Sequence, residues 1–510
     1  MDLVFIDAYG VAVLAFMGLV LTVGILTSQL VKKSSKRYMV AGKSLPLIFV
    51  GTMLCAQSID GNSSLGNVAL VYEFGFWAGA AIPIGLGTCL IVTSIFYAKK
   101  MNKMSMLTLP DFYFRRYNWG AEGMSSVLLS ISFIVLVAGN FAAGGFILST
   151  VLHIPLFWGM VIVSLAVLVY TFAGGLFSSA YTDIFQVYLT IGAFWAAFLY
   201  FAFGFAGVDL GTILAATPES YIDLSGLTDV ENGALINWAG IIALGLGDVV
   251  ALDFMERIFS AKDGKTARRG ALMAGIITFS IIVPTSMMGT IALYMMPDIE
   301  DPYTVYPLLA INLLPFPIGA ALLMGVLGAS MSTANGGLLA ISSVIARNLI
   351  QRDILRSLLK RPGIEDKKLL IVTRCVTIPV MLSGLLLGAA IPRPGIYLIL
   401  AFDIVFAGAW APVTLGLFWK KANWPAAISS MIVGSVLRLI MYFITPPEYA
   451  GVDTFIPPVV AFAVFIIVAL LTQKKHPGFK KHGVVDYVPP EEDVVNGEDL
   501  KNYVTPTTEK

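Results

Sequence analysis

Thirteen long apolar runs constrain this chain more than any other feature of its sequence. Each is long enough to cross a hydrocarbon core of about 30 Å, which takes roughly 20 helical residues. Backbone polar groups in lipid must be satisfied within the chain, so we expect every run to be helical. The predicted spans are residues 8–30, 44–72, 74–98, 120–152, 155–173, 177–205, 235–260, 269–297, 316–350, 368–391, 394–419, 422–446 and 455–473.

The composition agrees with an all-α membrane protein. Hydrophobic residues make up 57% of the 510 residues and charged residues 13%, against about 25% charge in soluble chains. Histidines 153, 476 and 482 fall outside the predicted spans, and the spans bring together no combination of His, Cys or Ser with a base. We therefore expect a multi-pass protein of the plasma or inner membrane that is not an enzyme. Its expected partners are a small solute and the lipid bilayer, with no nucleic acid and no obligate protein partner.

The distribution of basic residues predicts the orientation, because cytoplasmic loops are enriched in Lys and Arg. If residue 1 is outside, nearly all of the 33 basic residues fall in inside loops or in the C-terminal tail. The loop 206–234 then faces outward, and it carries five acids and no base. We predict an outside N-terminus and a cytoplasmic C-terminus.

The predicted spans and loops divide the chain into six parts. We expect a leading helix and first cytoplasmic loop (1–43), a five-helix unit (44–205), the extracellular loop (206–234), a second five-helix unit (235–419), two peripheral helices (420–473) and a disordered cytoplasmic tail (474–510). Because five is odd, the second unit would insert upside down relative to the first. This is the inverted repeat of many secondary transporters.

Five aspartates lie within the predicted spans: Asp60, Asp183, Asp248, Asp253 and Asp403. An ionised Asp at the bilayer centre costs about 2.5–3.5 kcal/mol on insertion scales. The spans from 44 to 419 carry basic residues only near their predicted cytoplasmic ends. We therefore expect the missing positive charge to come from Na⁺, H⁺ or a cationic substrate.

These acids differ in how readily a structural role explains them. Asp253 has Arg257 four residues later, which fits an ion pair within one helix, and Asp183 could interact with a helix N-terminus. Asp60 and Asp248 stand beside glycines in mid-span, in SIDGNSSLG and LGLGDVV. Interrupted helices at matching places in two repeats indicate a binding site. The alternative is that the glycines permit close packing and the acids are protonated.

Two motifs resemble signatures of the sodium:solute symporter family: YTFAGGLFSSAYTDIFQ (170–186) and GASMSTANGGLLAISSVIARNL (328–349). The similarity extends over nearly all of residues 5–475 and is nearest to the choline-transporter branch. It implies a LeuT-type fold and alternating access driven by sodium. The implied sodium ligands are the carbonyls of Ala56, Ile59 and Ala329 and the hydroxyls of Ser332 and Thr333.

The resemblance also implies a sodium-related role for Asp183, which in some family members belongs to a second sodium site. The hydroxyl positions of that site are Asn335 and Gly336 here. We therefore expect one sodium ion, with Asp183 acting on its inner exit path.

The substrate that the sequence favours is a small cationic or zwitterionic amine. Ala251 stands where the choline branch carries a tryptophan, whereas carboxylates suit an amine that donates hydrogen bonds. The candidate substrate contacts are Asp60, Asn62, Ser63, Trp77, Asn140, Asp248, Asp253 and Phe406. Proton coupling, a carboxylate or amino-acid substrate, and a non-transporting solute sensor are the alternatives.

Overall fold

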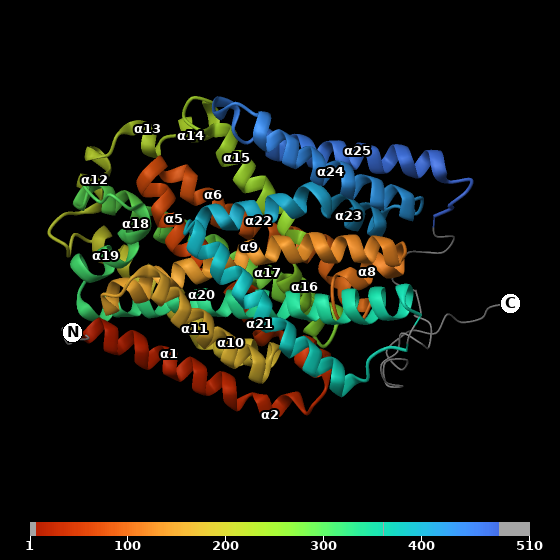
Figure 1. Ribbon diagram of the computed structural model, residues 1–510. Helices are drawn as coiled ribbons and strands as arrows, with labels where there is room; N and C mark the ends of the chain where they lie inside the picture. The colour runs from red at the N-terminus through yellow and green to blue at the C-terminus, as the bar shows by residue number, and fades with distance from the viewer. Residues whose placement is uncertain (1–6, 361, 479–510) are drawn as a thin grey trace.

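The computed structural model describes residues 7–360 and 362–478, whose helices form a bundle along a common axis (Figure 1). Within these residues, ten helices are long and apolar enough to cross a bilayer, and two bent pairs raise that number to as many as twelve. The prediction of an all-α, multi-pass membrane protein is confirmed. The number thirteen and the orientation stay predictions, and most of the tail lies outside the described residues.

The chain runs through its helices in the following order. The first part contains α1 (Ala8–Leu26), α2 (Ser28–Val31), α3 (Ser35–Val40), η1 (Ala41–Lys43), α4 (Leu47–Ser58), α5 (Gly61–Phe74), α6 (Phe76–Val92), η2 (Thr93–Tyr97), α7 (Ala98–Lys103), α8 (Pro110–Arg116), α9 (Trp119–Leu152), α10 (Leu156–Gly174), α11 (Leu176–Ala202), α12 (Leu210–Ala216), α13 (Glu219–Ile222) and α14 (Ser225–Thr228). The second part contains α15 (Ala234–Ile242), η3 (Ala243–Gly247), η4 (Asp248–Val250), α16 (Leu252–Ser260), α17 (Gly264–Ser280), α18 (Ile282–Met295), η5 (Pro302–Thr304), α19 (Val305–Asn312), α20 (Phe316–Val344), η6 (Ile345–Leu358), α21 (Asp366–Ala390), α22 (Pro394–Gly408), α23 (Trp410–Phe418), α24 (Trp424–Ile444), η7 (Pro447–Tyr449) and α25 (Val452–Thr472).

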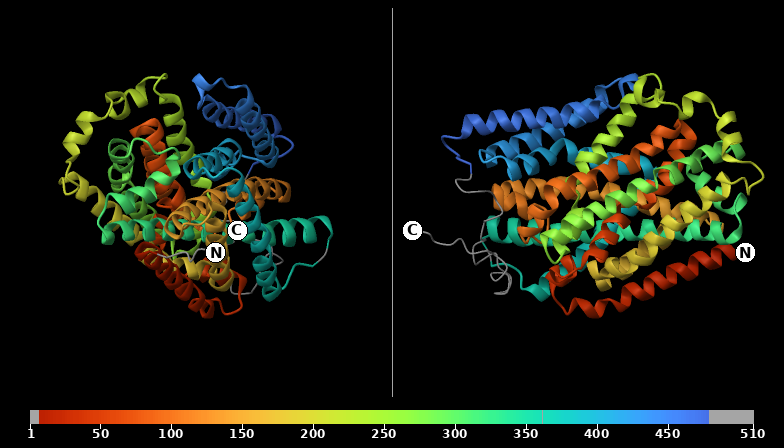
Figure 2. Two further views of the ribbon diagram at one scale, coloured as in Figure 1. Left: turned by 60° about the vertical axis from the view of Figure 1, so that its left-hand side comes forward. Right: turned by 180° about the vertical axis from the view of Figure 1, so that it is seen from behind.

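The two ends of the bundle differ in charge. One end carries α2, α8 and the C-terminal side of α16, and the Lys- and Arg-rich connections lie there; we name it the basic end. The other end carries α12, α13 and α19 beside the N-terminus, and we name it the acidic end (Figures 1 and 2). In the predicted orientation the basic end is cytoplasmic.

Three predicted spans are interrupted rather than straight. The span 44–72 consists of α4 and α5, which are separated at residues 59 and 60. The span 235–260 bends by 46° between Val250 and Leu252, and the span 394–419 bends by 49° between Gly408 and Trp410. Asp60 lies in the first break, and Asp248 lies three residues before the second break at Ala251, directly after the π-helical turn η3.

One boundary differs from the prediction. The span 316–350 was expected to end in a loop, but α20 continues into the π-helical η6 and ends at Leu358. Helical spacing brings Arg347, Asn348 and Arg352 to one side, where they bind buried acids of α8 and α9. The added helix is therefore explained by tertiary hydrogen bonds, which the local sequence does not reveal.

The long helix α20 lies at the centre of the bundle and packs against α11, α9 and α1. Small residues allow close approach there. At Gly61, the first residue of α5, the hydroxyl of Ser330 stands where a Cβ would be. The break that precedes α5 is thus held directly against α20.

Candidate ion and substrate site

The break between α4 and α5 is built by a capping box. Ile59 (φ −104°, ψ 74°) and Asp60 (φ −105°, ψ −178°) leave the helical conformation. The Asp60 carboxylate accepts from the Ser63 N–H at 2.6 Å, and the Ser63 hydroxyl accepts from the Asp60 N–H at 2.8 Å. These bonds satisfy backbone donors at the start of a new helix. They also leave the Ala56 carbonyl without the Asp60 N–H that a continuous helix would supply.

The released carbonyl of Ala56 lies against α20. It accepts a hydrogen bond from the Thr333 hydroxyl at 3.3 Å. Residues Ala56, Ile59, Ala329, Ser332 and Thr333 are all at most 2% exposed. Unwound carbonyls beside hydroxyls are the kind of oxygen donors that coordinate Na⁺ in transporters with broken helices, so the residues that the family resemblance implies fit a sodium ion.

Asp183 on α11 lies next to this set. Its carboxylate accepts from the Ser332 hydroxyl at 2.7 Å and from the Ser179 hydroxyl at 2.7 Å. The carboxylate thus reaches the candidate sodium ligands through the Ser332 hydroxyl. It is fully buried within the described structure.

Arg257 lies in the last turn of α16, near the end of its predicted span, and is buried there. Its fully buried side chain donates from Nη2 to the Ser179 hydroxyl at 3.0 Å, one hydrogen bond away from Asp183. Its Nη1 donates to the backbone carbonyl of Asp253 at 3.1 Å, rather than making the carboxylate pair predicted from the spacing. The Asp253 carboxylate lies in the first turn of α16 and accepts from the Phe254 N–H at 2.7 Å.

Neutral donors surround the other face of Asp60. Its carboxylate accepts from the Asn140 amide at 2.8 Å and from the Asn62 amide at 3.2 Å. The structure therefore brings together four of the predicted substrate contacts: Asp60, Asn62, Ser63 and Asn140. Amide and backbone donors satisfy this carboxylate without neutralising its charge.

Asp248 lies at the second break and has a different environment. It follows the π-helical turn η3, and Ala251 is extended (φ −62°, ψ 133°) before α16 begins. Asp248 is 0% exposed, and neither carboxylate oxygen has a hydrogen-bond partner among the described residues. It is close enough to Asp253 and Asp60 for their charges to interact. A buried carboxylate without a partner is costly, so this position calls for a proton or a cation.

Asp403 does not belong with these acids. The Nε of Arg438 donates to its carboxylate, and the Thr454 hydroxyl donates at 3.2 Å. Arg438 also pairs with Asp453 at 2.8 Å. The expectation that Asp403 lacks a counter-charge within the chain is wrong, because α24, predicted as a peripheral helix, carries Arg438 to it.

The two aromatic candidates lie in different places. Trp77 donates its indole N–H to the carbonyl of Asp223 at 2.6 Å, so it is attached to the loop 206–234 at the acidic end. Phe406 packs closely against η3. A Cβ added to Gly247 of η3 would lie only 2.7 Å from the Cβ of Phe406. Phe406 thus lies beside the second break, and Trp77 lies near the outer ends of α5 and α6.

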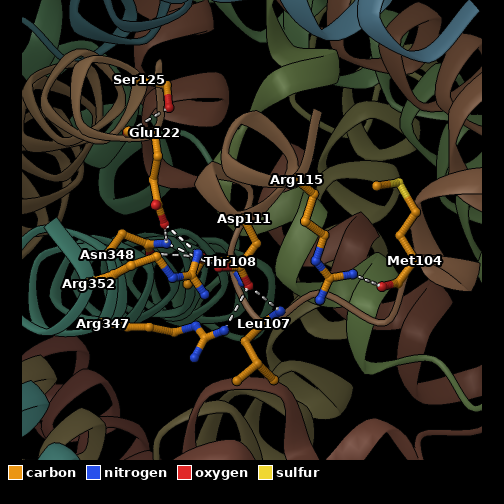
Figure 3. A network of polar contacts seen from close by, with 10 residues as sticks. All are labelled: Met104, Leu107, Thr108, Asp111, Arg115, Glu122, Ser125, Arg347, Asn348 and Arg352. Carbon is orange, nitrogen blue, oxygen red and sulfur yellow. Dashed lines mark hydrogen bonds and ion pairs between the residues drawn. The ribbon is translucent and has the colours of Figure 1, made fainter. Parts of the chain in front are cut away.

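A second buried polar cluster, which we name the basic-end network, joins α8, α9 and η6 (Figure 3). Arg352 donates to Asp111 at 3.0 Å and to Glu122 at 2.6 Å. Asn348 donates to the same two carboxylates at 3.1 and 2.6 Å, and Arg347 donates to Asp111 at 3.3 Å. This network was not predicted from the sequence. Its signal was an acid in an inside loop, Asp111, only four residues before two arginines.

The basic-end network holds its central carboxylate in the charged form. Burial alone would raise the pKa of Asp111, but the guanidiniums of Arg347, Arg352 and Arg115 together hold that pKa well below its usual range. A carboxylate with such partners contributes stability in its ionised state. The network therefore fixes α9 and η6 to each other at the basic end.

The fold is shared with solved transporters. A Na⁺-coupled sialic acid symporter in a substrate-bound outward-open state superposes with a TM-score of 0.76 at 17% identity, over 91% of this chain and 97% of that one. Mhp1, a nucleobase-cation-symport-1 family transporter in a closed conformation, gives 0.53 at 14% identity, over 87% and 96%. These likenesses show the LeuT-type fold.

Relatives in sequence are also transporters. The human "High affinity choline transporter 1" is 25% identical over 452 residues, covering 84% of this chain and 76% of that protein. The "Sodium/glucose cotransporter" of Vibrio parahaemolyticus is 26% identical over 479 residues, covering 86% and 85%. The "Sodium/pantothenate symporter" of Escherichia coli (strain K12) is 26% identical over 466 residues, covering 86% and 92%.

The family model settles the classification. Residues 38–434 match the model of the "Sodium:solute symporter family", which is more than half of the chain. The protein is a multi-pass membrane transporter and not an enzyme. The chain belongs to the sodium:solute symporter family, whose members couple solute movement to sodium.

Proposed function

We propose that this chain imports a small cationic or zwitterionic amine together with Na⁺. The observation that carries the proposal is Asp248, a carboxylate that is fully buried at a helix break and has no donor among the described residues. An ammonium group would supply both the missing hydrogen bonds and the missing charge. The sequence relatives support the sodium dependence, and their named solutes differ from one another.

Sodium would bind at the first break. Its ligands would be the carbonyls of Ala56, Ile59 and Ala329 and the hydroxyls of Ser332 and Thr333, which are buried at the contact of α4 with α20. Asp183 would orient the Ser332 hydroxyl, since the two are 2.7 Å apart. Binding would replace the hydrogen bond between Thr333 and Ala56 with two ion contacts.

The amine would lie between the two breaks. Asp248 would accept its hydrogen bonds, and Asp60 would provide a second negative charge, held in place by Asn62, Ser63 and Asn140. Asp253 would extend the acidic lining toward the basic end, and Phe406 would form a wall beside Asp248. Trp77 would line the outer approach, next to the loop 206–234.

Transport would follow alternating access. Sodium arriving from outside would join α4 and α20 and order the break that presents Asp60. The solute would then bind, the acidic end would close, and the basic end would open. An inside-negative potential contributes about 2.3 kcal/mol per charge per 100 mV, so the entering ion favours accumulation of the solute.

The test is a thermal-shift screen of the purified chain with amines, betaines and carboxylates, each with and without NaCl. We expect an amine to raise the apparent Tm of the chain in NaCl. In choline-free potassium buffer the same amine should raise the Tm far less. The same amine should accumulate in proteoliposomes under an inward sodium gradient. Stabilisation by carboxylates alone contradicts the amine assignment. Uptake in sodium-free buffer that collapses with a protonophore indicates proton coupling, and binding without any uptake indicates a sensor.

A further inference from the structure

Arg257 stands beside the proposed ion site in a position that the proposed function does not use. Its guanidinium is fully buried and is linked through Ser179 to Asp183, by bonds of 3.0 and 2.7 Å. Asp183 is linked in turn to Ser332, a proposed sodium ligand, at 2.7 Å. One chain of hydrogen bonds therefore joins the guanidinium of Arg257 to the proposed sodium site.

Gln57 joins the guanidinium to the same site from α4. With its amide oriented by its hydrogen-bond partners, its oxygen accepts from Arg257 Nη2 at 3.1 Å and its nitrogen donates to Asp253 at 3.0 Å. The amide also lies 3.2 Å from the Ser332 hydroxyl. The guanidinium thus contacts α4 and α11 while belonging to α16.

Gly336 makes the space for this guanidinium. A Cβ at Gly336 would lie 2.6 Å from Arg257 Nη2, closer than real side chains approach. Gly336 is on α20, one helical turn after Ser332. The same Cβ would lie 2.5 Å from the side-chain amide of Gln57, so any other residue there would crowd both the guanidinium and the amide that binds it.

From this geometry, and resting on the sodium site of the proposed function, we propose that Arg257 is a built-in cation that takes the place of a second sodium ion beside Asp183. A buried carboxylate next to a sodium site would otherwise attract an ion of its own. The guanidinium supplies that charge from within the chain, and a second free cation is repelled by it. The transporter therefore binds a single exchangeable sodium ion.

The experiment measures sodium stoichiometry on the purified full chain, by equilibrium binding of radioactive sodium and by the Hill coefficient of the sodium-dependent thermal shift. We expect one ion per wild-type chain and two per Arg257→Gln chain, with the Hill coefficient rising accordingly. The double variant Arg257→Gln/Asp183→Asn should return to one ion. Arg257→Lys keeps the charge and should bind one. Arg374→Gln removes a different guanidinium, one that binds the carbonyl of Ala173, and should also bind one.

A folded Arg257→Gln chain that binds one ion with unchanged affinity overturns the proposal, and so does a wild-type chain that binds two. If Arg257→Gln does not fold, Gly336→Ala provides the second test. Its methyl group crowds the guanidinium and the Gln57 amide and adds no oxygen ligand, so two ions are expected, and one ion again overturns the proposal. A wild-type chain that binds no sodium contradicts the proposed function instead, so the two failures are distinguishable.

Discussion

The basic-end network and the acids around the two helix breaks are both buried, but their charge balance differs. The network places two carboxylates, those of Asp111 and Glu122, beside the guanidiniums of Arg347 and Arg352. The region of the breaks places five carboxylates beside one guanidinium: Asp60, Asp183, Asp248, Asp253 and Glu256, with Arg257.

This difference indicates which region needs a bound ligand to neutralise its buried charges. A buried charge that lacks a partner is strongly destabilising, whereas a paired one is tolerated. In the network, side chains of η6 donate hydrogen bonds to Asp111 of α8 and Glu122 of α9, so these two carboxylates have partners within the chain. The breaks leave negative charge that the chain does not neutralise, which is the electrostatic condition for binding mobile cations.

The largest expected effect is the loss of the sodium response when the two hydroxyls of the ion site are removed. In Ser332→Ala/Thr333→Ala, each lost oxygen that binds a charged group costs about 1.5–3 kcal/mol, so sodium affinity falls roughly 100-fold or more. Sodium-dependent thermal shift and sodium-driven uptake both measure it.

The matched control for this double variant is Ser342→Ala on the same helix. The Ser342 hydroxyl is buried but donates to its own helix, at the carbonyl of Leu339, at 3.0 Å. It should keep the sodium response of the wild type. A double variant that also keeps that response would place the ion elsewhere.

The next largest effect concerns stability and separates the two regions directly. Asp111→Asn leaves Arg347 and Arg352 beside an uncharged amide, and breaking a buried pair in this way costs about 3–5 kcal/mol. We expect a clear fall in the apparent Tm without ligand. An unchanged Tm would mean that these contacts, at 3.3 and 3.0 Å, contribute little.

The third prediction concerns the same Asp-to-Asn change beside the second break. Asp248→Asn removes a buried carboxylate that has no donor, so the Tm without ligand should stay the same or rise. The affinity for the amine should fall about 10- to 100-fold, since a hydrogen bond to a charged group is worth about 1.5–3 kcal/mol. A large fall in Tm with unchanged amine affinity would reverse the comparison and make Asp248 a structural residue.

The sequence predicted an all-α, multi-pass membrane protein because lipid imposes a length and an apolar composition on each spanning helix. It also predicted the two breaks, since Asp60 and Asp248 stand beside glycines in stretches that would otherwise be uninterrupted helices. The sodium ligands are implied by the family resemblance and stay a prediction; two of them, Ala56 and Thr333, are hydrogen-bonded to each other between α4 and α20.

The sequence did not predict the partners of the long arginine side chains. Arg257 is four residues from Asp253, which suggested a pair within one helix, but its guanidinium extends to Ser179 on α11. Arg438 lies within the predicted span 422–446, and its partner Asp403 is on another helix. Such reach depends on how the helices pack, so local spacing does not determine it.

The smallest expected effect is the pH dependence of the basic-end network. The pKa of Asp111 is depressed in the folded chain by its guanidinium neighbours, so its contribution to stability is fully present above the ordinary carboxyl pKa of about 3.9 and declines as the pH falls below it. The Tm difference between wild type and Asp111→Asn should therefore be constant from about pH 7 to pH 5 and narrow below about pH 4. Thermal unfolding of both chains across this range measures it. A difference that already narrows above pH 5 would mean that Asp111 is not held ionised, and the charge balance of the network would then resemble that of the breaks.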